Sequence, residues 1–74
     1  MFVNVKFKFR TIVKLCVGSK VKTFVKDDVS VRCQGFTTMP NEIHLYEIRE
    51  HECAIMVIPT DMVDEMEIVR DKHE

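Results

Sequence analysis

The sequence predicts a mainly β protein, a small antiparallel barrel or curled sheet of five to six strands, with at most one short C-terminal helix. Three observations lead to this prediction. Apolar side chains recur at alternate positions from Val3 to Cys33, which is the period of a half-buried strand. Turn-forming residues such as Gly18-Ser19 interrupt the alternation. A continuous apolar run, Cys53 to Ile58, is typical of a strand covered on both faces.

The length and composition indicate one domain spanning residues 1–74, with 46% apolar and 31% charged residues. The longest apolar run is too short to cross a bilayer, and Lys6, Lys8 and Lys14 interrupt any signal-peptide core. The chain has three cysteines, an odd number without the spacing of a disulfide framework. We therefore expect a cytoplasmic protein with no membrane partner.

The first half is predicted to be a meander. Phe2 to Phe9 alternates most strictly, and its apolar phase continues through Arg10-Thr11. Residues 2–17 are thus one long strand bent near Arg10, or two strands joined at a bulge. Gly18-Ser19 suits a two-residue type II′ turn, after which Lys20 to Lys26 returns antiparallel.

Asp27-Asp28 is predicted to be the next turn, with Val29 to Cys33 as a third strand of the meander. Gln34 to Asn41 contains Gly35 and Pro40 and is predicted to be a loop. In that loop Phe36 is either an exposed aromatic that contacts a ligand or a cap on the end of the barrel.

In the second half, residues 42–48 are predicted to form a strand with apolar residues on both faces, followed by a polar turn at Arg49 to Glu52. Cys53 to Ile58 is expected to be the most buried strand, ending at Pro59. Residues 60–72 have two interpretations. One is an amphipathic helix, and the other is a single 3₁₀ turn followed by a last short strand.

The second interpretation brings a resemblance. The turn Val17-Gly18-Ser19-Lys20-Val21, a meander, a buried strand, a one-turn helix and a final strand together resemble an SH3-like small barrel. The resemblance covers about Val13 to Arg70, with Phe2 to Phe9 as an added strand. It implies a fold and no particular activity.

A second, local resemblance lies in Glu50-His51-Glu52-Cys53-Ala54-Ile55-Met56-Val57. It is similar to a Glu-His-x-x-Ala-Ile-x-Val stretch in the trp RNA-binding attenuation protein family, whose members form all-β rings. That family has basic RNA-contacting residues where this chain has Met56 and Ile58, and its central loop is longer. No site residue is carried over.

Charge is distributed unevenly along the chain. Residues 1–41 hold eight Lys/Arg and two Asp, whereas residues 42–74 hold three Lys/Arg and ten acids. Either the halves neutralise each other, within the fold or between subunits, or the basic half contacts an anionic partner. The predicted nucleic-acid-binding face carries the basic residues of the first half with one aromatic among them: Lys6, Lys8, Arg10, Lys14, Lys20, Lys22, Phe24, Lys26 and Arg32.

No catalytic site is predicted, and the chain is not expected to be an enzyme. The two glycines lie too far apart for a phosphate-binding loop. The histidines and cysteines lack the paired spacing of a zinc site, so neither a metal nor another cofactor is expected.

These observations predict a non-enzymatic regulatory protein that binds nucleic acid or another polyanion through the basic face. The alternative is a small protein-binding inhibitor or adaptor of the phage type, acting through its bipolar surface. A homo-oligomer is also expected, because a domain of this size has a small core and Phe2 to Phe9 has the pattern of an exposed edge strand.

Overall fold

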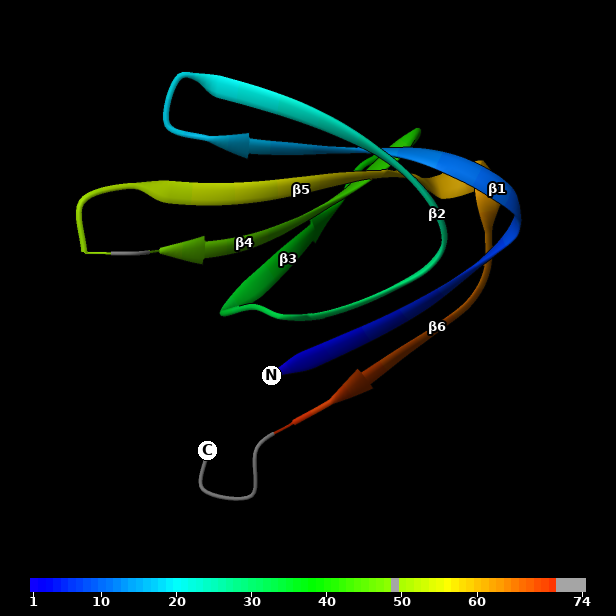
Figure 1. Ribbon diagram of the computed structural model, residues 1–74. Coiled ribbons are helices and arrows are strands. Elements are labelled where there is room, and N and C mark those ends of the chain that lie inside the picture. The colour runs from blue at the N-terminus through cyan, green and yellow to red at the C-terminus, as the bar shows by residue number, and fades with distance from the viewer. Residues whose placement is uncertain (49, 71–74) are drawn as a thin grey trace.

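The computed structural model describes residues 1–48 and 50–70. Six antiparallel strands form one curled sheet that does not close into a barrel, as predicted for the fold class (Figure 1). The strands follow the order β2-β1-β5-β4-β3, and β6 pairs with β1 outside this path. Their bounds are β1 (Phe2–Val17), β2 (Lys20–Arg32), β3 (Gly35–Thr38), β4 (Glu42–Ile48), β5 (Cys53–Pro59) and β6 (Val63–Val69).

Strand β1 organises the sheet because it pairs with three other strands. Its N-terminal half lies between β2 and β6, and its C-terminal half lies between β2 and β5. The strand bends sharply between the two halves, as expected near Arg10 (Figure 1). The prediction that Phe2 to Phe9 forms an exposed edge is wrong, since residues 2–6 have a hydrogen-bonded neighbour on both sides. Residues 2–6 therefore offer no free edge to a second chain.

The turn between β1 and β2 has the predicted type II′ form. Val17 pairs with Lys20, and Gly18 has a φ of 59°. No non-glycine residue in the described part of the chain has a positive φ, so Ser19 stays in the ordinary region. Glycine is needed at the first central position because a side chain there would crowd the backbone.

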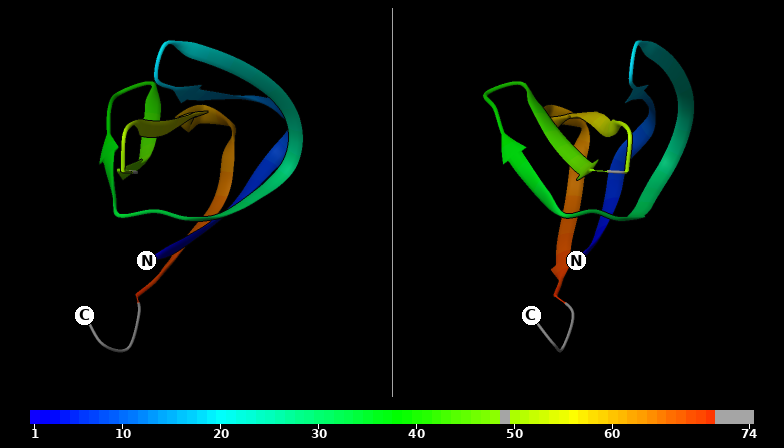
Figure 2. Two further views of the ribbon diagram at one scale, coloured as in Figure 1. Left: turned by 60° about the vertical axis from the view of Figure 1, so that its left-hand side comes forward. Right: turned by 90° about the vertical axis from the view of Figure 1, so that its left-hand side faces the viewer.

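Asp27-Asp28 does not form a turn, contrary to the prediction. β2 runs without interruption from Lys20 to Arg32 and follows β1 around its bend (Figure 2). Lys6 pairs with Asp28 and Thr11 pairs with Lys26, so residues 7–10 of β1 lie against Asp27 alone. This shift in register gives β1 more residues than β2 at the bend, so β1 can follow the longer, outer path. Val29 to Cys33 is thus mostly the end of β2 rather than a separate strand.

The predicted loop at Gln34 to Asn41 also contains a strand, β3, which pairs with β4. Phe36 on β3 is half-buried against the core, which favours the capping interpretation. Residues 60–72 follow the second interpretation as far as they are described. A 3₁₀ turn, η1 (Thr60–Met62), leads into β6, and residues 71 and 72 lie outside the described part.

Strand β5 is central, between β1 and β4, and it is the least exposed strand of the sheet, as predicted. Ile58 is fully buried and Ala54 is buried, whereas Ile55 and Val57 are half-buried and Cys53 is exposed. Arg49, in the predicted polar turn before β5, lies outside the described residues.

The core fills the concave side of the curl. Directly opposed residues in a ladder share a face, so the pairings Val5 with Val29, and Ile43 with Ile58, assign these side chains to the same side of the sheet. The buried cluster on this face comprises Val3, Val5, Phe7, Val13, Val29, Cys33, Ile43, Leu45 and Ile58.

Candidate nucleic-acid interface

An open groove of about 400 Å³ lies on the concave face, between the β1–β2 hairpin and β5. We call it the concave groove. Its lining is mostly apolar, and the polar members come from β2. The lining residues are Val13, Leu15, Phe24, Lys26, Asp28, Val29, Ser30, Val31 and Met56. A second depression of about 300 Å³ shares Leu15 and adds Val17, Lys20 and Lys22, which extends the groove toward the hairpin turn.

Three lysines line the β2 side of this groove. Lys20 pairs with Val17, Lys22 with Leu15, and Lys26 with Thr11. Because opposed residues share a face, all three side chains leave the strand on the concave side, next to apolar residues of β1. The three positions are solvent-exposed, so their ammonium groups stay hydrated at the edge of the groove.

Phe24 lies among these lysines, directly opposite Val13. Its ring is 40% exposed, and Lys26 Nζ lies 5.9 Å from the ring centroid. An exposed aromatic with cations beside it offers a flat surface for a base and positive charge for a phosphate.

The other predicted site residues do not join this cluster. Lys14 pairs with Thr23 and Val57 on the opposite, convex face. Lys6 lies between Asp28 and Glu65, its partners on β2 and β6, so acids flank it in the sheet. Arg32 lies over the ring of Phe2, at 5.1 Å from the centroid. Lys8 and Arg10 lie at the bend, where Arg10 Nε is 3.7 Å from Asp27 Oδ1 between two highly exposed side chains.

The single continuous basic face predicted from the alternation is therefore wrong. The slip at Asp27 changes the phase of β2, so its even positions from 20 to 26 face the concave side, as Val29 and Val31 do. β1 keeps its phase through the bend, and its even positions face outward. The sheet thus separates the lysines of β2 from Lys14 and Lys6 of β1.

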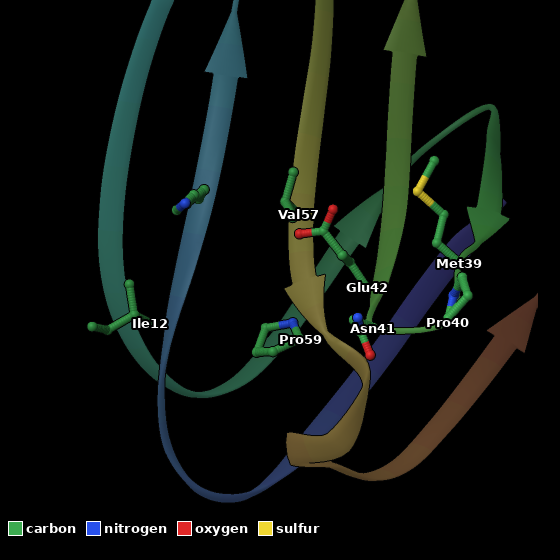
Figure 3. A pocket seen from close by; sticks show the side chains of 8 residues that line it. Ile12, Met39, Pro40, Asn41, Glu42, Val57 and Pro59 are labelled. Carbon is green, nitrogen blue, oxygen red and sulfur yellow. The ribbon is translucent and has the colours of Figure 1, made fainter.

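The convex face carries a feature that the sequence interpretation did not identify. We call it the apolar outer face, formed by outward side chains of β2, β1, β5 and β4: Ile12, Cys16, Val21, Val25, Tyr46, Ile55, Val57 and Pro59. A shallow groove of about 700 Å³ crosses it between Ile12 and the loop of Met39 and Pro40 (Figure 3). The continuous run Cys53 to Ile58 could have indicated this face, because its odd-numbered and even-numbered residues are both apolar.

The cysteines and histidines form no reactive cluster in the part of the chain that the structure describes. Cys16 is half-buried, Cys33 is buried and Cys53 is exposed, and all are free thiols. Burial raises the pKa of the Cys33 thiol above its ordinary value, despite the opposing effect of the nearby N-terminal amino group. Among the described residues, no three His, Cys, Asp or Glu side chains are arranged to hold a metal ion.

None of the described residues forms a helix long and apolar enough to span a membrane. Comparison with protein-family models, with curated proteins and with solved structures found no significant match.

Proposed function

We propose that the protein is a non-enzymatic regulator that binds single-stranded nucleic acid in the concave groove. The observation that carries this proposal is the alternation of Lys20, Lys22, Phe24 and Lys26 along one side of an apolar groove. Alternate residues of a strand lie about 6.6–6.8 Å apart, so the lysines present a row of charges that can follow a phosphate backbone.

The groove favours a single strand over a duplex. Unpaired bases expose apolar faces that can stack on Phe24 and contact Val13 and Met56. A duplex keeps its bases stacked inside and presents mainly phosphates at its surface. An apolar lining adds little to duplex binding.

Charge reversal tests the proposal. The Lys22→Glu/Lys26→Glu variant should lose most of its affinity for labelled oligothymidylate and oligouridylate, measured by fluorescence anisotropy at several salt concentrations. Three lysine–phosphate contacts give a slope of log K against log salt of about −2 for a single strand, and one remaining contact gives about −0.7.

The matched control is Lys8→Glu/Arg10→Glu, which changes the net charge equally at exposed positions of the bend. It should keep the wild-type slope and lose affinity only slightly. Circular dichroism should show both variants folded. Equal losses in the two variants, or no binding by the wild type at low salt, would exclude the concave groove as the site.

The alternative function, an inhibitor or adaptor that binds another protein, is supported by the apolar outer face. Binding centred on apolar contacts depends weakly on salt, so the salt dependence of binding to the partner separates the two functions. Affinity purification from lysate with and without nuclease then identifies the class of partner.

A further inference from the structure

The apolar outer face exposes several large apolar side chains to solvent. Ile12 and Val21 are each 61% exposed and Val25 is 56% exposed. Cross-strand pairing places Ile12 opposite Val25, and it places the half-buried Cys16 opposite both Val21 and the half-buried Ile55. The result is an apolar patch over several strands, crossed by Lys14 and Thr23, and such a surface marks a binding interface.

Strand β5 supports the same conclusion from inside the sheet. Ala54 and Ile58 are buried on the concave side, while Ile55 and Val57 on the convex side are only half-buried. A strand that is apolar on both faces normally belongs to a sheet covered on both faces. Among the described residues, the buried cluster lies on the concave face alone.

The charged groups on this face identify the occupant. Lys14 on β1 and the pair of Glu42 and His44 on β4 lie on either side of β5, with His44 Nε2 3.1 Å from Glu42 Oε1. A two-fold axis along β5 would bring β1 of one copy over β4 of the other. Lys14, Val57 and His44 lie in one row across the sheet, so Lys14 of each copy would lie over His44 of the other, beside the Glu42 carboxylate that contacts His44. The two Lys14–Glu42 contacts would flank an apolar centre formed by Val57 and Pro59.

We propose that the apolar outer face is the interface of a symmetric dimer of this chain. Two such sheets pack with their strands aligned within about 30° and about 10 Å apart. The same axis brings the loop of Met39 and Pro40 over Val25 of the other copy, so the shallow groove and this exposed valine are both covered. The concave groove lies on the opposite face, so dimerisation does not depend on the proposed nucleic-acid binding.

The first experiment measures mass by light scattering after size exclusion, on nuclease-treated protein at micromolar concentration. The wild type should have twice the chain mass of 8.7 kDa. Ile12→Lys should halve the measured mass, because it places a charge inside the interface. Phe9→Lys is the matched control, since Phe9 is 74% exposed at the bend, and it should remain a dimer.

The second experiment tests the predicted ion pairs by exchanging their charges. Lys14→Glu alone and Glu42→Lys alone should each be monomeric, because like charges then meet twice. An equimolar mixture of the two variants should form a heterodimer, since every meeting of positions 14 and 42 is again between opposite charges. Circular dichroism checks that each variant is folded.

A wild-type mass of 8.7 kDa up to several hundred micromolar would overturn the proposal. A dimer that survives Ile12→Lys would place the interface elsewhere. Failure of the mixture to associate while the wild type dimerises would reject the two-fold axis along β5. Co-purification of a different protein in place of a second copy would assign the face to that partner.

Discussion

Val13 lies directly opposite Phe24, so the aromatic ring of β2 shares the concave face with one of the most buried residues of β1. The two side chains form one apolar surface across the two strands. Phe24 is nevertheless 40% exposed, because β2 is an edge strand of the sheet that the described residues form. This combination of packing and exposure gives the concave groove an aromatic residue that a ligand can reach.

Phe24→Ala should weaken binding of single-stranded oligonucleotides by about 1–3 kcal/mol, the usual effect of removing one stacking aromatic. The salt slope should stay unchanged, because no lysine is removed. Anisotropy titrations measure both quantities. Phe9→Ala, an exposed aromatic outside the groove, should bind as the wild type does. A change in slope without a loss of affinity would contradict the stacking role.

Ile58→Ala should lower the free energy of unfolding by about 2–5 kcal/mol, because Ile58 is fully buried and its loss leaves a cavity. Ile55→Ala, on the half-buried convex side of the same strand, should lower it less. Urea denaturation at low protein concentration measures both variants while limiting any contribution from association. Equal losses would mean that the convex side is as well packed as the core.

Gly35→Ala should destabilise the fold by about 1–3 kcal/mol, because an added Cβ would lie 2.6 Å from Tyr46 Cζ. Tyr46 is the cross-strand partner of Gly35, and its ring lies over the glycine. In the Gly35→Ala/Tyr46→Ala double variant the clash is absent. The cost of Gly35→Ala, measured by thermal or urea unfolding, should therefore be much smaller in the Tyr46→Ala background.

The buried thiol predicts a dependence of stability on alkaline pH. Burial raises the pKa of Cys33, so the folded state favours the neutral thiol. The resulting stability is complete below the unfolded thiol's pKa of about 8.5 and is lost as the pH rises toward the folded pKa. Urea denaturation from pH 7 to pH 10 should show this loss, and Cys33→Ala should reduce it. The exposed Cys53→Ala should keep the wild-type dependence.

Local sequence signals predicted the elements that depend on neighbouring residues. Strict alternation identified the first strand and its bend, and Gly18-Ser19 identified the turn, because only glycine readily adopts the required φ. The strand at residues 42–48 and the central strand after it followed from apolar patterning. These features are decided by backbone sterics and by one buried face.

The features that failed depend on pairing between distant residues. Asp27-Asp28 has the composition of a turn, but β1 is long enough to pair along the whole of β2, so the chain continues through it. The slip there reverses the side-chain phase of Lys20 to Lys26, and no local pattern records a slip between two strands. Edge position is equally non-local. Phe2 to Phe9 became central only because β6, more than fifty residues later in the chain, pairs with it.

The threefold pairing of β1 has a consequence for how the protein opens. Removing β1 would separate β2, β5 and β6 from one another, so its amides should exchange with deuterium only when the whole molecule unfolds. Among the described strands β3 is hydrogen-bonded to β4 alone, so it can detach by itself. Exchange rates should therefore form two groups. The slow group reports global stability from within β1, and the fast group reports local opening at the far edge of the sheet.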